Sequence, residues 1–209
     1  MSSKIREPFN ALSHLVAAVL VLAGTFALIF ASWPHPAAWV SFLVFGAGAI
    51  FLYISSAVYH WTPQVIPSLQ KLDHTAIYVM IAGCYTPLCV LLLTGGVGWW
   101  VLAAQWGLAI TGVVLTLIME KPPTWVRLVL YLVMGWMALP FASQVVAKSG
   151  WETMAWMIAG GLFYTVGVIF YASKRPRLWP GVFSSHELWH CFVMAGTACH
   201  FMLMVAILS

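Results

Sequence analysis

The sequence is poor in charged residues. Only 7% of its 209 residues are Asp, Glu, Lys or Arg, whereas 63% are hydrophobic. Soluble domains carry roughly 25% charged residues, so this chain lacks the polar side chains needed to cover a water-exposed surface. The composition therefore excludes a soluble globular domain and predicts a polytopic helical membrane protein. In this setting the net charge of +4 is assigned to loop anchors, and no nucleic-acid partner is expected.

Neither a cysteine framework nor a cleavable signal is expected from the sequence. It contains no C-x-x-C pair, and each of its four cysteines lies within an apolar run, where cysteine acts as a small buried apolar side chain. No disulfide framework is therefore expected. The apolar run that follows the N-terminus is long, and no small-residue cleavage pattern follows it, unlike in a secretory signal.

Long apolar runs are what the sequence has in abundance. A spanning helix needs about 20 mostly apolar residues, and proline and glycine are expected at the joints between spans. Short loops leave no room for a second domain, so residues 1–209 are predicted to form one all-α integral membrane domain, a seven-transmembrane helix bundle. The predicted spans are approximately 11–31, 39–60, 73–93, 99–119, 125–146, 151–173 and 183–208.

The basic residues predict the orientation of this bundle. With seven spans, the side that holds the N-terminus carries eight of the nine basic residues, and Lys148 alone lies on the other side. Because cytoplasmic loops are enriched in Lys and Arg, the N-terminus is expected in the cytoplasm and the C-terminus outside. The eight residues are Lys4, Arg6, Lys71, Lys121, Arg127, Lys174, Arg175 and Arg177.

Several polar residues lie in the predicted spans at one membrane depth. Polar groups within spans are costly and usually face the bundle interior. The second span ends on the N-terminal side, and the third and seventh spans begin there. The span count therefore places His60, Asp73, His186 and His190 in one slab near the cytoplasmic face, and His14 of the first span falls in the same slab.

The spacing of these residues predicts a zinc site. His186 and His190 stand at i, i+4 and share a helix face. Together with His60 they provide three imidazoles, and a water would complete a tetrahedral Zn²⁺ site with an open position. Imidazole suits zinc better than magnesium or calcium, which prefer oxygen ligands. Asp73 would hold and deprotonate the water. Ser56 and His60 also stand at i, i+4 and share a helix face.

Further polar residues allow more than one interpretation. Glu7, Asn10 and His14 stand at i, i+3, i+7, which fits either one polar stripe beside the metal or a polar helix start with local capping. Both alternatives remain open from the sequence. His74 is expected to be an interfacial polar residue, and His200 is expected to bond a neighbouring carbonyl group.

Residues 186–190 also spell H-E-x-x-H, a metalloprotease motif. Intramembrane proteases place this motif on an early helix and take a carboxylate ligand from a later one. Here the order is reversed, because Asp73 precedes His186. The extra histidine, His60, also favours the three-histidine arrangement. Glu187 is therefore expected to be a polar group at the membrane interface or behind the ligands, and not a catalytic base.

Three ordered motifs carry a resemblance to a known family. They are E-P-F-N-A-L-S-H at residues 7–14, S-A-V-Y-H at 56–60 followed by Asp73, and H-E-L-W-H at 186–190. Over essentially its whole length the chain resembles the bacterial hemolysin III family, a branch of the progestin and adipoQ receptor (PAQR) superfamily. The resemblance implies that His60, His186 and His190 are zinc ligands in a multi-pass protein of the bacterial inner (plasma) membrane. It likewise implies that Asp73 and Ser56 lie beside the water.

The same resemblance implies several functions. The superfamily is similar to alkaline ceramidases, which are zinc amidases, so a zinc-dependent hydrolase of membrane lipid amides or esters, acting in membrane lipid homeostasis, is expected. One alternative is a non-enzymatic regulator or receptor in which a structural zinc, with Asp73 or Ser56 as fourth ligand, joins two helices. The other is a cytolysin, as the family name implies. A secreted pore former must first be soluble, and the composition opposes this.

Overall fold

The computed structural model describes residues 5–120, 122–179 and 182–208. Lys4 and Lys121, which contributed to the predicted charge bias, lie outside these ranges. The described residues form helices and no strand, apart from an isolated bridge between Trp179 and Phe183. Six helical stretches within them are long and apolar enough to cross a membrane, which agrees with the prediction of an all-α membrane protein.

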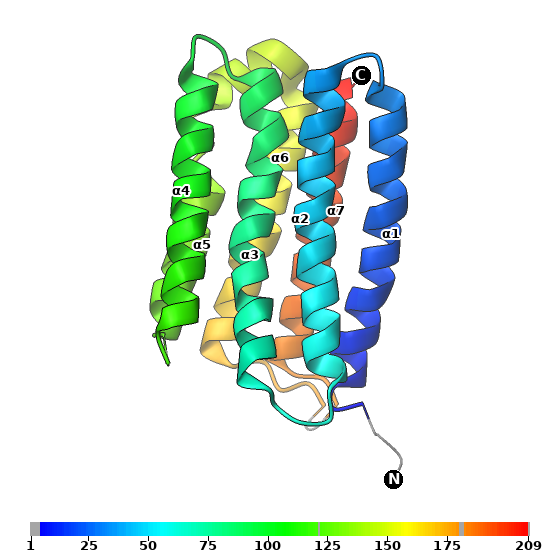
Figure 1. Ribbon diagram of the computed structural model, residues 1–209, viewed down its shortest axis with the longest axis vertical. Coiled ribbons are helices and arrows are strands. Elements are labelled where there is room, and N and C mark those ends of the chain that lie inside the picture. The colour runs from blue at the N-terminus through cyan, green and yellow to red at the C-terminus, as the bar shows by residue number, and fades with distance from the viewer. Residues whose placement is uncertain (1–4, 121, 180–181, 209) are drawn as a thin grey trace.

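The helices stand side by side as one upright bundle (Figure 1). The start of α1 lies at the lower end of the bundle in this view, and the end of α7 lies at the upper end. A π-helical segment, Leu88–Leu92, continues α3, and a short 3₁₀ turn, Leu139–Phe141, follows α5. The α-helices are α1 (Pro8–Ser32), α2 (Pro36–Trp61), α3 (Pro67–Pro87), α4 (Val97–Ile118), α5 (Thr124–Trp136), α6 (Ala142–Ser173) and α7 (Ser185–Leu208).

The first three helices begin earlier than predicted, each with a proline in its first turn. Proline suits this position because its fixed φ matches the helix and its missing N–H would have no partner there. The largest difference is in α3, which begins at Pro67 and not at residue 73. As a result, Asp73 and His74 lie in the second turn of α3, where the helix is already packed against its neighbours.

The segment 124–173 differs from the sequence prediction. Spans at 125–146 and 151–173 were expected, with a break between them. Instead α5 ends at Trp136, a 3₁₀ turn containing Pro140 follows, and α6 runs from Ala142 to Ser173. Proline has no backbone N–H and disrupts the α-helical ladder, which accounts for the earlier break. Near the expected break only Gly150 leaves helical geometry, with φ 80° and ψ 176°.

Helices α2 and α3 approach closely through two glycines. A Cβ atom on Gly48 would lie 3.2 Å from the carbonyl oxygen of Val79, and one on Gly83 would lie 3.2 Å from that of Val44. Such distances are tighter than almost all real Cβ contacts, so both positions favour glycine. Small residues at a helix crossing allow the two backbones to come together in a membrane protein. This contact fixes the spacing of the helices that carry His60 and Asp73.

Candidate metal site

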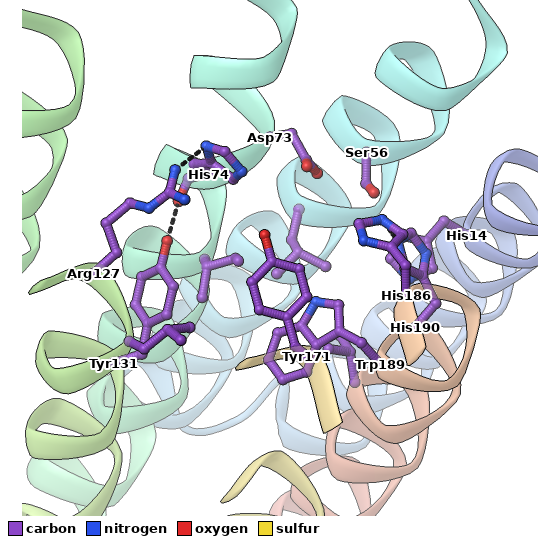
Figure 2. A pocket seen from close by; sticks show the side chains of 14 residues that line it. His14, Ser56, Asp73, His74, Arg127, Tyr131, Tyr171, His186, Trp189 and His190 are labelled. Atoms are coloured by element: carbon purple, nitrogen blue, oxygen red, sulfur yellow. Dashed lines mark hydrogen bonds between the residues drawn. The ribbon is translucent and has the colours of Figure 1, made fainter. Parts of the chain in front are cut away.

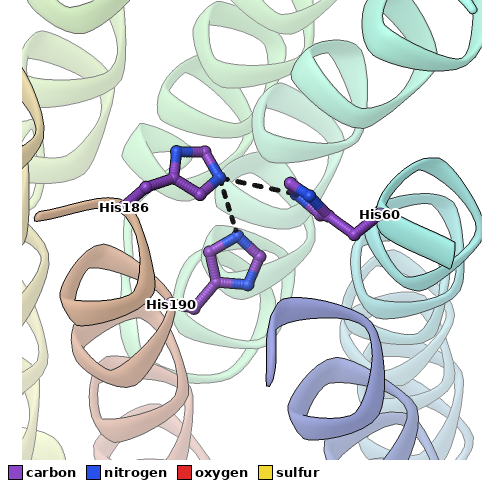
Figure 3. Close-up of side chains that lie close together, drawn as sticks. All are labelled: His60, His186 and His190. Carbon is purple, nitrogen blue, oxygen red and sulfur yellow. Dashed lines mark hydrogen bonds between the residues drawn. The ribbon is translucent and has the colours of Figure 1, made fainter. Parts of the chain in front are cut away.

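Three histidines meet at the lower end of the bundle. His60 belongs to the last turn of α2, and His186 and His190 belong to the first two turns of α7. Figure 3 shows the three rings turned toward one another. The Nε2 atom of His186 lies 3.5 Å from Nε2 of His60 and 3.3 Å from Nε2 of His190. The predicted convergence of these residues in one slab of the bundle is thus observed.

The separation of these nitrogen atoms fits a shared metal ion. Zinc–imidazole bonds of 2.0–2.1 Å in a tetrahedron place two ligand nitrogens about 3.3–3.4 Å apart. The distances of 3.3 and 3.5 Å lie close to that value, and all three candidate ligand atoms are within 4.8 Å of one another. Within the described ranges no fourth His, Cys, Asp or Glu joins the group. The three histidines could therefore hold a metal ion, as predicted. In a tetrahedral site, no His, Cys, Asp or Glu of the described ranges would occupy the fourth coordination position.

Glu7 holds His60 in this orientation. Its carboxylate contacts Nδ1 of His60, which leaves Nε2 of the same ring to face the other two histidines. A carboxylate behind a metal-binding histidine fixes the tautomer and the direction of the ring. This hydrogen bond is also the main reason that the pKa of Glu7 is lowered to about 2. Glu7 makes no side-chain capping bond at the start of α1, so the capping alternative does not apply to it.

Asn10 and Glu187 connect the starts of α1 and α7. The Nδ2 group of Asn10 donates to Glu7 Oε2 at 3.3 Å and to Glu187 Oε1 at 3.0 Å. Glu187 Oε2 accepts from both the backbone N–H and the hydroxyl of Ser184 at 2.7 Å. The arrangement resembles a capping box: the Glu187 carboxylate accepts from the Ser184 N–H, and the Ser184 hydroxyl accepts from the His186 N–H at 3.4 Å. The carboxylate of the H-E-x-x-H motif is therefore engaged at the helix start.

His14 lies directly against one of the candidate ligands. Its ring stacks on that of His190, with centroids 3.9 Å apart and planes at 29°, and it meets Tyr53 edge to face. The side chain is only 3% exposed, and neither ring nitrogen has a hydrogen-bond partner among the described residues. His14 therefore supports the position of His190, and its polar atoms remain available to whatever fills the adjoining cavity.

A cavity of about 40 Å³ opens beside the histidines. This volume is enough for water, because one water molecule needs roughly 10–15 Å³ by this measure. Figure 2 shows Asp73 and Ser56 pointing into the space near His186. The cavity is thus bordered by two candidate metal ligands, His186 and His190, by the Asp73 carboxylate and by the Ser56 hydroxyl. These four residues are also expected near one another from the sequence.

The opposite wall of this cavity carries residues whose role the sequence analysis missed. Arg127 of α5 contacts Nδ1 of His74 through Nη1, and the Tyr131 hydroxyl donates to the His74 carbonyl oxygen at 2.8 Å. Figure 2 shows this group facing the histidines across the cavity. The sequence alone predicts a loop anchor for Arg127 and an interfacial residue for His74. Their position depends on the rotation of α3 and α5, for which the sequence gives no direct signal.

A second, mostly apolar cavity of about 80 Å³ adjoins the first. It is bordered by residues of α2, α3, α5, α6 and α7, among them Trp136, Met157 and His200. Five residues border both cavities, so the two spaces are neighbours. The shared residues are Leu52, Ile77, Tyr131, Trp189 and Val193.

The fold and the site define a multi-pass helical membrane protein with a buried three-histidine group that could hold a metal ion. Within that class, the chain belongs to the family described as Haemolysin-III related, whose family model matches residues 2–201. This agrees with the resemblance found in its three sequence motifs. The chain is a multi-pass protein of the bacterial inner (plasma) membrane, as predicted.

Two bacterial relatives cover nearly the full chain, and a plant relative covers about three quarters of it. Hemolysin-3 of Bacillus cereus is 32% identical over 206 residues, which cover 96% of this chain and 91% of that protein. The Hemolysin-3 homolog of Bacillus subtilis (strain 168) is 33% identical over 199 residues, covering 93% and 91%. The heptahelical transmembrane protein ADIPOR1 of Oryza sativa subsp. japonica is 29% identical over 77% of this chain and 48% of its own length.

Proposed function

We propose that the chain crosses the membrane seven times, with its N-terminus in the cytoplasm. The fifth membrane-length stretch, Thr124–Ser173, has 50 residues. As one straight helix it would measure about 75 Å, against a hydrocarbon core of about 30 Å, so it holds two passes. The start of α1 and the end of α7 lie at opposite ends of the bundle, as an odd number of passes requires (Figure 1). The rice relative is itself called heptahelical.

We propose that the protein is a zinc-dependent hydrolase of an amide or ester bond in a membrane lipid, acting in membrane lipid homeostasis. The observation that carries this proposal is the shared cavity: His186 and His190, two members of the three-histidine group, border the same space as Asp73 and Ser56. Three neutral imidazoles are a donor set that suits Zn²⁺. The neighbouring apolar cavity supports a substrate with a hydrocarbon chain, because its apolar side chains would contact such a chain and would leave a polar, water-soluble substrate without hydrogen-bond partners.

The residues around the cavity have distinct roles in this reaction. A zinc ion held by His60, His186 and His190 would supply the Lewis acidity that polarises the carbonyl group and activates a water. Asp73 accepts the proton of the attacking water and returns it to the leaving nitrogen or oxygen as the acyl bond breaks. Ser56 orients the water through its hydroxyl. Arg127, on the opposite wall, provides N–H groups for the acyl oxygen or for the carboxylate of the fatty acid product.

A structural zinc in a non-enzymatic regulator is the second candidate. It is favoured by one observation, the bridging of α2 and α7 by the three histidines. Structural zinc sites are usually closed by four protein ligands. Asp73 lies outside the group of candidate ligand atoms, so the open, hydrolytic arrangement is the better-supported proposal. The cytolysin alternative is supported only by the names of the bacterial relatives.

The test is zinc-dependent release of fatty acid from a panel of ceramides and glycerolipids by purified protein in nanodiscs. Asp73→Asn should retain about one zinc per chain and lose release by at least about 100-fold, since general acid–base groups contribute roughly 10²–10⁴-fold. Glu120→Gln, at an exposed carboxylate, is the matched control. Undiminished release by Asp73→Asn would contradict the assigned acid–base role. Release that survives removal of zinc, or no release from any lipid, would contradict the hydrolase.

A further inference from the structure

His200 is a polar residue on the border of the apolar cavity. Its Nδ1 atom is buried and has no hydrogen-bond partner among the described residues. The ring packs against α6 at Gly160, where an added Cβ would lie 2.7 Å from His200 Nε2. Nδ1 therefore does not make the expected bond to a neighbouring carbonyl among the described residues, and it keeps unused hydrogen-bonding capacity in a ring that borders an apolar space.

The position of His200 on α7 relates it to the metal site. His186, Val193 and His200 follow one another at intervals of seven residues, so they share one face of the helix. His200 lies ten residues beyond His190, which corresponds to about 15 Å along the helix axis. Val193 borders both cavities between these histidines. An extended ligand that starts at the metal site and passes Val193 therefore reaches His200.

The other hydroxyl groups at this cavity already have partners. Those of Tyr85, Tyr164 and Thr165 each make hydrogen bonds within the protein. A buried water needs two to four polar partners, and this largely apolar space offers few beyond His200. A hydroxyl group on an otherwise apolar chain meets both conditions, because it fills the space and can either donate to or accept from an imidazole nitrogen.

We propose that the apolar cavity selects an acyl chain that carries a hydroxyl group about 15 Å from the metal site, where His200 bonds it. This rests on the proposed function, since the carbonyl end of the chain is placed at the three histidines. A plain acyl chain fills the same space but leaves His200 unsatisfied. The loss of one such hydrogen bond corresponds to a preference of about tenfold for the hydroxylated chain.

The test is the binding of two matched fatty acids to the zinc-loaded protein in nanodiscs. Ricinoleic acid and oleic acid share chain length and double bond, and they differ by one hydroxyl about two thirds of the way along the chain. Each is titrated against a bound fluorescent fatty acid, so the readout is affinity and does not require turnover. Ricinoleic acid should bind wild type about tenfold more tightly than oleic acid.

Substitution of His200 should remove this preference. His200→Leu should bring the two affinities to within about twofold, and His200→Asn, which keeps a polar side chain, should retain part of the difference. His35→Leu, at an exposed position before α2, is the control and should behave as wild type. Zinc content near one per chain checks that each variant is folded.

Failure of this inference differs from failure of the proposed function. Equal binding of the two acids by wild type, a preference that survives His200→Leu, or no binding of either acid would overturn the role of His200. Asp73-dependent release of fatty acid could still be observed in each of those cases. Conversely, a preference for ricinoleic acid that depends on His200, without any hydrolysis, would support the chain site and contradict the proposed reaction.

Discussion

Glu7 and His60 lie 53 positions apart in the sequence and are joined by two hydrogen bonds. The backbone N–H of Glu7 donates to the His60 carbonyl oxygen at 3.2 Å, and the Glu7 carboxylate contacts Nδ1 of the same residue. The short segment before α1 is thereby fixed to the last turn of α2. The direction of one candidate metal ligand is consequently set by a residue that precedes the first helix.

Glu7→Gln should weaken zinc binding about 10- to 100-fold, the usual effect of removing a group that orients a metal ligand. The amide preserves size and can still bond Nδ1, but it lacks the negative charge that increases the basicity of the ring. Competition with a chelator of known affinity measures the change, and Glu120→Gln provides the control. Unchanged affinity in Glu7→Gln would show that this contact does not tune the site.

His60→Ala and His190→Ala should each reduce zinc from about one equivalent to a small fraction, because two imidazoles leave the tetrahedral site incomplete. Elemental analysis of protein purified without chelator gives the stoichiometry. His35→Ala removes an exposed histidine at the far end of α2 and should keep full occupancy. Wild-type protein free of metal under these conditions would refute the site.

Glu187→Ala should lower the free energy of unfolding by about 0.5–2 kcal/mol, since it removes half of the capping box at the start of α7. Glu187→Gln should be close to wild type, because glutamine can also bond the Ser184 N–H. Both variants should bind zinc and catalyse the proposed lipid hydrolysis as the wild type does. Thermal unfolding in detergent and metal analysis measure these quantities. If Glu187→Gln were folded and metal-loaded yet inactive, Glu187 would be a catalytic base after all.

Reporter fusions should reveal the orientation. Alkaline phosphatase, which is active only outside the cytoplasm, should be active when joined after Leu208 and inactive when joined between α4 and α5, near Glu120. A fluorescent protein that folds only in the cytoplasm should give the opposite pattern. Phosphatase that is inactive at both positions would indicate an even number of passes.

The depth of the site could be predicted from the sequence, but its orientation around the helices could not. The number of spans between two residues determines which end of the bundle each reaches, and that was sufficient to bring His60 to His186 and His190. The number of spans contains no information about the rotation of each helix around its axis. Arg127 is therefore predicted in a loop from the sequence, although it borders the cavity. The interruption after Trp136 was missed because Pro140 lies in an otherwise unbroken apolar run.

The two glycines between α2 and α3 set the distance between the helices that carry His60 and Asp73. Gly48 lies twelve residues before His60, about 18 Å along α2, and Gly83 lies ten residues after Asp73 on α3. One added methyl group at either glycine would press on a backbone carbonyl and wedge the two helices apart by a few tenths of an ångström. Such a wedge would widen the gap between the imidazole and the carboxylate while leaving every polar side chain intact. In the proposed hydrolase, a loss of activity is therefore expected from a change in helix packing near the middle of the bilayer, at residues that take no part in proton transfer.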